Sequence, residues 1–117
     1  MKPKKLVAQK CVPCERRMRP LSGMSILPYL AELPDWKVVN GRKIEREFQF
    51  QDFKTALKFI NTIAGIAEKE GHHPDMFLHN WNKVTVMLST HAISGLSKND
   101  LILAAKVSAL VPNKRKK

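Results

Sequence analysis

The dipeptide Asn40-Gly41, set between two runs of strand-forming residues, is the feature that most restricts the fold. Asn-Gly favours a two-residue turn of type I′, because both central positions of that turn need a positive φ. In the run that follows, Ile44 and Phe48 fall on one side of a strand, and charged or amide side chains fall on the other. The pattern predicts a half-buried antiparallel hairpin over residues 36–50.

The segment between Asp52 and Gly71 has the hydrophobic period of an amphipathic helix. Asp52 is a favourable N-cap residue, and Gly71 is a natural residue to follow the last turn. We therefore expect one long helix between them. The residues expected to form its apolar stripe are Phe53, Ala56, Leu57, Ile60, Ile63, Ala64 and Ala67.

Two shorter helices are predicted near the ends of the chain. Between residues 22 and 33, Pro28 cannot lie deep in a helix, because it lacks an N–H and clashes with the preceding turn. We expect Ser25 to be the N-cap there, which places Pro28 in the first turn, where proline is tolerated. The sequence Ser-Lys-Asn-Asp at 97–100 is a capping-box pattern that opens a last helix.

Residues 75–80 and 83–90 form a second predicted strand pair, so the element order is α-β-β-α-β-β-α. That order predicts an α+β domain whose antiparallel sheet is covered on one face by helices. Residues 83–90 carry only Lys83 as a charge and contain no proline. We therefore expect this strand to be a poorly protected sheet edge, open to pairing with another chain.

The formal charge of +11 lies at the two ends of the chain. Residues 1–20 hold seven Lys/Arg against one acidic residue, and residues 114–117 add four basic residues. This leaves ten basic and nine acidic residues in 21–113, which are nearly neutral. Basic termini can bind phosphate backbones, but they are more often only solvated, so nucleic acid is not the expected partner.

The same composition divides the chain into three parts. We expect an irregular basic extension over 1–20, one domain over 21–112 and a basic tail over 113–117. The chain has no apolar run approaching the roughly 18–20 residues of a membrane span, and no recognisable signal peptide. The expected location is the cytoplasm, with an organelle or the nucleus left open and no membrane partner.

Cys11 and Cys14 are separated by two residues, which is the spacing of half a zinc site. The chain has no second cysteine pair, so zinc would need a partner subunit or histidines as further ligands. A redox role lacks a thioredoxin-like context. We expect no function for this pair.

The four histidines lie close together in the sequence, and imidazole is suited to proton transfer or metal binding. Pro74 favours an extended conformation at His73, so His72 and His73 are expected to point to opposite sides and not to chelate one ion. A metal site that combines one of them with His91 and Asp100 has no supporting spacing. No metal is therefore expected.

General acid–base catalysis by these histidines, steered by Glu68 or Asp100, suits the pattern better. The histidines belong to three motifs with defined spacing. The motifs are Glu68-x3-His72-His73-Pro74, Trp81-x2-Val84 and Thr90-His91-x3-Gly95-Leu96-Ser97-x2-Asp100. Together they resemble the pterin-4a-carbinolamine dehydratase family, and the Gly-His-His-Pro-Asp sequence at 71–75 is similar to its plant-type branch. The resemblance covers roughly residues 20–110.

This resemblance implies a four-stranded antiparallel sheet with three helices on one face. It also implies that subunits join through sheet edges and helices into homodimers or homotetramers. The implied activity is that of a lyase without a cofactor. It removes water from 4a-hydroxytetrahydropterin to give quinonoid dihydropterin, a step in tetrahydrobiopterin recycling.

The resemblance also implies residue roles. His72, His73 and His91 are the implied acid–base and pterin-contacting set. The C4a hydroxyl leaves only when protonated, and N5–H must lose its proton. One imidazolium and one neutral imidazole can do both, and which histidine takes which role stays open. The implied binding or supporting residues are Glu68, Pro74, Asp75, Trp81, Thr90 and Asp100.

Two other classes of function remain as alternatives. Animal members of the family also act as a dimerisation cofactor of a homeodomain transcription factor, so a non-catalytic interaction protein is one alternative. The other is a nucleic-acid binder that uses the basic tails.

Overall fold

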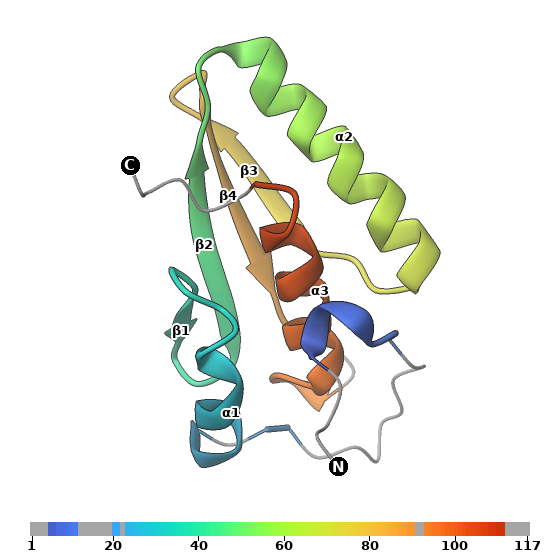
Figure 1. Cartoon of the computed structure of the whole chain (residues 1–117). Coiled ribbons are helices and arrows are strands. Elements are labelled where there is room, and N and C mark those ends of the chain that lie inside the picture. Colours follow the sequence, from blue (N-terminus) through green and yellow to red (C-terminus); the bar gives the residue numbers. More distant parts are fainter. Residues whose placement is uncertain (1–4, 12–19, 22, 91–92, 112–117) are drawn as a thin grey trace.

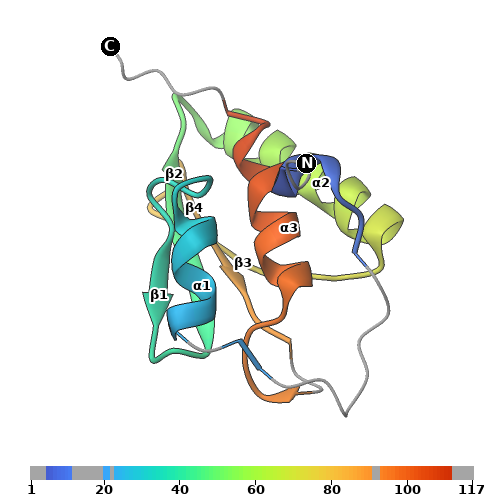
Figure 2. The same cartoon turned by 60° about the horizontal axis from the view of Figure 1, so that its bottom comes forward.

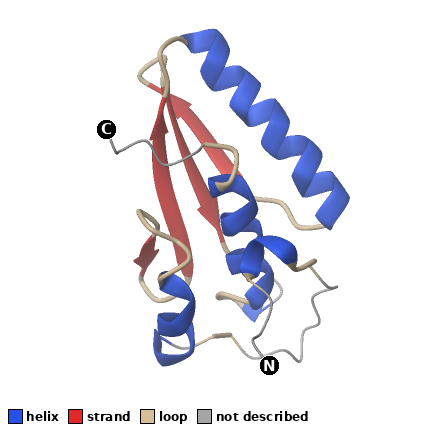
Figure 3. Ribbon diagram, viewed as in Figure 1, coloured by secondary structure: helices blue, strands red, loops and turns tan. Residues whose placement is uncertain are grey.

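The computed structural model describes residues 5–11, 20–21, 23–90 and 93–111 (Figure 1). The elements follow the predicted order, after a short 3-10 helix. Their bounds are η1 (Leu6–Ala8), α1 (Gly23–Leu30), β1 (Lys37–Val39), β2 (Lys43–Gln49), α2 (Phe53–Glu70), β3 (Asp75–His79), β4 (Lys83–Leu88) and α3 (Lys98–Ser108). Figures 2 and 3 show the helices on one side of the sheet, which confirms the predicted α+β class.

The sheet is antiparallel and has the strand order β1-β2-β4-β3. The prediction that the strand in 83–90 is an edge was wrong, because β4 pairs with β2 on one side and with β3 on the other. Its lack of charge reflects a position inside the sheet, where Val84, Val86 and Leu88 are buried. The outer strands are β1 and β3.

The first hairpin has the turn geometry expected from Asn-Gly. Asn40 and Gly41 have φ values of 54° and 67°, and the N–H of Arg42 donates to the carbonyl of Val39 at 3.0 Å. The register pairs Val39 with Lys43, so the loop has one residue more than the two predicted. The Asn-Gly sequence therefore predicted the positive φ values correctly, but it did not predict the length of the loop.

Helix α2 begins and ends where its capping residues predicted. A side-chain oxygen of Asp52 accepts the N–H of Thr55 at 2.8 Å, and Gly71 has a φ of 69°. The hydrogen bonds from the side chain and backbone of Thr55 lower the pKa of the Asp52 carboxyl group.

The predicted apolar stripe of α2 was correct only in part. The buried residues are Ala56, Phe59, Ile63 and Ala67. Phe53, Leu57 and Ala64, which were expected in the core, are exposed. Helix α2 has two neighbouring apolar stripes, and only packing against the sheet and α3 decides which of them is covered.

Helix α1 differs from its prediction at its N-terminus. It begins at Gly23, so Ser25 lies inside it and is not the N-cap, and Pro28 lies beyond the first turn. An eight-residue helix has few internal hydrogen bonds to lose, and burial of Ile26 against the core holds the element in place.

The N-terminal extension, expected to be irregular, contributes to the hydrophobic core. Leu6, in η1, is fully buried in the same cluster as α3 and the sheet. Cys14 and the tail 113–117 lie outside the described residues, and the predicted limits of the domain stay predictions.

Replacing Leu6 with alanine tests this packing. We expect Leu6→Ala to lower the free energy of unfolding by about 2–5 kcal/mol, as loss of a buried leucine does. The matched control is Val7→Ala, because Val7 is the neighbouring residue and is exposed; its effect should stay within about 0.5 kcal/mol. Urea unfolding followed by circular dichroism measures both. Equal, small effects would mean that the segment is not packed in solution.

Candidate active site

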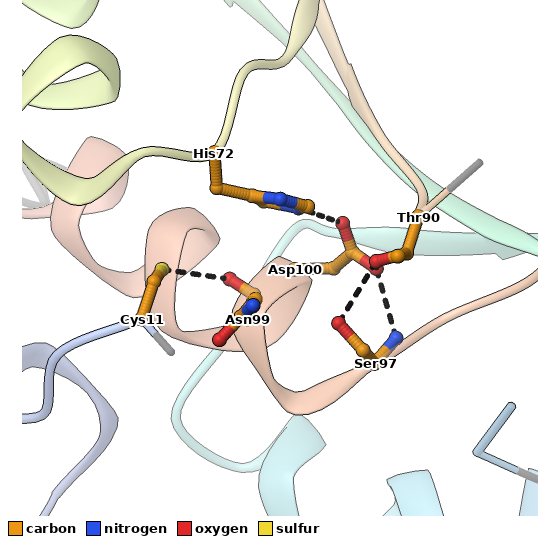
Figure 4. Close-up of polar contacts among 6 residues, drawn as sticks. All are labelled: Cys11, His72, Thr90, Ser97, Asn99 and Asp100. Atoms are coloured by element: carbon orange, nitrogen blue, oxygen red, sulfur yellow. Dashed lines mark hydrogen bonds and ion pairs between the residues drawn. The ribbon is translucent and has the colours of Figure 1, made fainter. Parts of the chain in front are cut away.

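A buried histidine–aspartate pair lies where the chain leaves α2 and meets the start of α3 (Figure 4). Nε2 of His72 is 2.6 Å from Oδ1 of Asp100. The His72 residue is 8% exposed and Asp100 is 0% exposed. Asp100 is therefore an acidic group with no access to water, and it depends on protein donors.

Those donors come from three parts of the chain. Oδ2 of Asp100 accepts the hydroxyl of Thr90 at 2.7 Å and the N–H of Ser97 at 2.9 Å. The second contact belongs to the predicted capping box, which the structure confirms. Thr90 and Ser97 also share a hydrogen bond of 2.8 Å between their hydroxyl oxygens. One carboxylate thus caps α3 and binds the histidine.

The network fixes the tautomer of His72. The Ser97 N–H and the Thr90 hydroxyl both give a hydrogen to Asp100, which suits an ionised carboxylate. An ionised Asp100 requires His72 to carry a hydrogen on Nε2. Nδ1 is then the ring nitrogen that can exchange a proton with another molecule, as in histidines oriented by an aspartate in hydrolases.

His73 lies in a different environment, although it is the next residue. Its Nε2 is 2.7 Å from Oε2 of Glu68, in the last turn of α2. The side chains of His73 and Glu68 are 60% and 77% exposed. The two adjacent histidines therefore have different partners and different burial. An exposed contact of this kind adds little stability.

The structure does not bring every predicted residue to this pair. Pro74 is half-buried and Asp75 is exposed, and both follow His73 into β3. Trp81 is 61% exposed in the turn between β3 and β4. The register pairs Asp75 with Met87 at one end of this hairpin, so the turn holding Trp81 lies at the other end, away from His72.

Two predicted residues cannot be placed. His91, which directly follows Thr90, and Cys14 lie outside the described residues. Within the described part of the chain, no three His, Cys, Asp or Glu side chains are grouped as metal ligands would be. Cys11 contacts backbone and carboxylate groups: its N–H donates to Glu70 at 2.8 Å, and its thiol donates to the carbonyl of Asn99 at 3.6 Å.

Two residues of the motif at 90–100, Ser97 and Gly95, have roles that the sequence did not predict. Ser97 was expected only as a helix cap, but its N–H and hydroxyl belong to the Asp100 network. The capping-box pattern was the signal that could have found it. Gly95 allows close packing, because a Cβ there would lie 2.8 Å from Cβ of Pro20. The Thr90 N–H also donates to the Gly95 carbonyl at 2.7 Å, which closes this loop.

Three cavities lined by described residues lie beside or away from the pair. A small one of about 190 Å³ is lined by Thr90, Ser94 and the start of β2. The cavities of about 440 and 370 Å³ both adjoin Arg46 and Asp35, near the C-terminal end of α3 and the part of β2 that lies beyond its pairing with β1. Burial lowers the pKa of Arg46, and Asp35 partly counteracts this. The Arg46 guanidinium donates to Ser108 at 3.1 Å and lies over the Phe48 ring, so its contacts are structural.

A sequence model of the family described as pterin 4 alpha carbinolamine dehydratase matches residues 19–110. The chain belongs to this family. A protein of Alkaliphilus metalliredigens (strain QYMF), provisionally named pterin-4-alpha-carbinolamine dehydratase, is 50% identical over 103 residues, which are 87% of this chain and 92% of the relative. The mitochondrial pterin-4-alpha-carbinolamine dehydratase 2 of Arabidopsis thaliana is 40% identical over 109 residues, which are 90% of this chain and 58% of the plant protein.

Solved structures show the same fold. The crystal structure of a transcriptional coactivator/pterin dehydratase from Brucella melitensis has a TM-score of 0.72 and 38% identity, and covers 79% of this chain and 98% of the other. A pterin dehydratase-like RuBisCO assembly factor of the alpha-carboxysome has a TM-score of 0.57 at 19% identity over 69% of this chain and 94% of the other, which is a likeness of fold alone. The predicted membership of the pterin-4a-carbinolamine dehydratase family is confirmed, including the likeness to a plant member.

Replacing Asp100 tests the network directly. In Asp100→Asn an amide NH₂ replaces one oxygen, so at least one of the three donors loses its acceptor. We expect the free energy of unfolding to fall by about 1–3 kcal/mol, the cost of leaving buried polar groups unpaired. Asp75→Asn is the control, because Asp75 is exposed and should change the value by less than about 0.5 kcal/mol. A stable Asp100→Asn protein in urea unfolding would contradict the network.

Proposed function

We propose that the protein is a 4a-hydroxytetrahydropterin dehydratase, which converts the carbinolamine to quinonoid dihydropterin and water. Family membership supports the class of reaction, a lyase acting on a pterin. The observation that carries the proposal is the buried contact of His72 with Asp100, because it leaves one imidazole nitrogen fixed for proton transfer.

The reaction needs two proton movements and no change of redox state. The C4a–O bond breaks after the hydroxyl gains a proton, water leaves, and the N5–H proton is lost as the new C4a–N5 double bond forms. His72 exchanges one of these protons through Nδ1, with Asp100 holding the ring. His73, beside Glu68, and His91 supply the second proton site and pterin contacts. Positioned groups of this kind contribute about 10²–10⁴-fold to a rate.

His72→Ala should lower kcat by about 10²-fold or more, because it removes a group that moves a proton. The assay follows formation of quinonoid dihydropterin from the carbinolamine. His79→Gln is the control, because His79 lies on the sheet, where its Nε2 is 2.9 Å from the Thr85 hydroxyl. Chelator-treated protein should retain its activity, since the proposed reaction uses no metal. Wild-type turnover in a folded His72→Ala protein would overturn the mechanism.

We propose further that the protein is a homo-oligomer, with contacts at two surfaces. The first is the open edge of β3, which carries the exposed Phe77. The second is the outer stripe of α2, where Phe53 and Leu57 are exposed. Contiguous apolar patches on the surface of a soluble protein often mark an interface, and we infer one here.

Charge on the α2 stripe tests the second surface. The double variant Phe53→Glu with Leu57→Glu should reduce the mass measured by light scattering at micromolar concentration, because buried charges destabilise an interface. Thr62→Glu is the control, since Thr62 is exposed on another face of α2. A wild-type mass of about 13 kDa, the mass of one chain, would show that the protein does not form oligomers.

An interaction protein is the second candidate. The Brucella relative is described as a coactivator as well as a pterin dehydratase. A partner that binds the His72→Ala protein as tightly as the wild type would support this role independently of catalysis. In the part of the chain that the structure describes, no helix is long and apolar enough to cross a membrane. A cytoplasmic location stays a prediction, and the Arabidopsis relative is named mitochondrial.

A further inference from the structure

The N-terminal strap, defined as residues 5–11, lies outside the part that the family model matches and yet packs against the core. Leu6 is fully buried, and its N–H donates to Oε1 of Glu32 at 2.8 Å. Helix α3 presents apolar residues on nearly every side, and a helix of that kind needs cover beyond one sheet face. The strap supplies part of this cover, as Figure 1 shows η1 beside α3.

Glu70, the last residue of α2, links the strap to α2 and, through Lys106, to α3. Its side chain is only 7% exposed. Oε1 of Glu70 accepts the N–H of Cys11 at 2.8 Å, and Oε2 lies 3.7 Å from Nζ of Lys106 on α3. Lys106 in turn donates to the carbonyl of Val7 at 2.9 Å. Cys11 of the strap is thereby bound to α2, and Val7 of the strap is bound to α3.

Cys11 connects the two chain segments that carry the histidine–aspartate pair. Through its N–H it contacts Glu70, two residues before His72. Through its thiol it contacts the carbonyl of Asn99, the residue before Asp100 (Figure 4). A bridge from α2 to the strap to α3 therefore links the two segments, in addition to the hydrogen bond between His72 and Asp100.

We propose that Glu70 is a positioning residue, which anchors the N-terminal strap and so holds His72 at bonding distance from Asp100. Without its carboxylate, the Cys11 N–H loses its Glu70 acceptor and Lys106 loses its ion-pair partner, so the end of α2 becomes free to shift against α3. A hydrogen bond of 2.6 Å weakens with small displacements. The effect on turnover rests on the proposed dehydratase function; the effect on His72 does not.

The test compares Glu70→Ala with Glu32→Ala in the full-length chain. Glu32 binds the same strap at Leu6, but it lies in the connection between α1 and β1, away from the pair. Two kinds of measurement are made at a temperature where circular dichroism shows each variant folded. One is solvent exchange of the Nε2 proton of His72, followed by ¹H–¹⁵N NMR, and the other is kcat and KM.

In Glu70→Ala we expect exchange of the His72 proton to become about tenfold faster. We expect kcat to fall about tenfold with KM nearly unchanged, because the proton-transferring group is misplaced. Glu32→Ala should show neither effect. Glu70→Gln keeps an oxygen acceptor for Cys11, so it should recover part of both losses, and it carries the comparison if Glu70→Ala does not fold.

Unchanged exchange and kcat in the folded Glu70 variants would overturn the proposal, and so would equal effects in Glu32→Ala, which would indicate general loosening. A wild-type protein without carbinolamine turnover would instead contradict the proposed function. The NMR comparison would then still decide whether Glu70 positions His72.

Discussion

The carboxylate of Asp100 is the constraint on which the candidate site depends. A charged group without access to water is stable only when its oxygens are fully hydrogen-bonded. Here the donors are the ring of His72, the hydroxyl of Thr90 and the N–H of Ser97. They come from the chain after α2, the chain after β4 and the start of α3. Satisfying one buried group thus requires three distant segments to meet, and the same meeting orients the histidine.

This arrangement separates two histidines that the sequence presents as a pair. His72 is buried in the network, whereas His73 is exposed beside Glu68. Adjacent residues in an extended chain point to opposite sides, so one motif supplies two imidazoles with different surroundings. Such a difference is what acid–base chemistry on two sides of a flat substrate needs.

The rest of the molecule supports the site or remains open for contacts. The sheet fixes where β4 ends, and with it the position of Thr90. The strap bridges the segments that carry His72 and Asp100 through Cys11. Among the described residues, none covers the outer stripe of α2 or the edge of β3. Among the described residues, the buried apolar side chains lie where the helices meet one face of the sheet. The exposed large apolar residues, such as Phe53 and Phe77, lie outside that contact.

The sequence by itself determined the features whose causes are local. The positive φ values at Asn40-Gly41, the cap at Asp52, the end of α2 at Gly71 and the capping box at 97–100 follow from the chemistry of a few neighbouring residues. The element order, the fold class and the family could therefore be predicted, the last from motifs of defined spacing.

Only the tertiary structure decided which surfaces are covered and which motif residues meet. The strand in 83–90 proved to be interior, and the covered stripe of α2 coincides only in part with the predicted one. Trp81 lies at the far end of its hairpin. Ser97 contacts Thr90, and Glu70 contacts Cys11, and no local pattern connects either pair. Burial and convergence depend on pairings between segments far apart in the chain, and the periodicity of one segment carries no information about its partner.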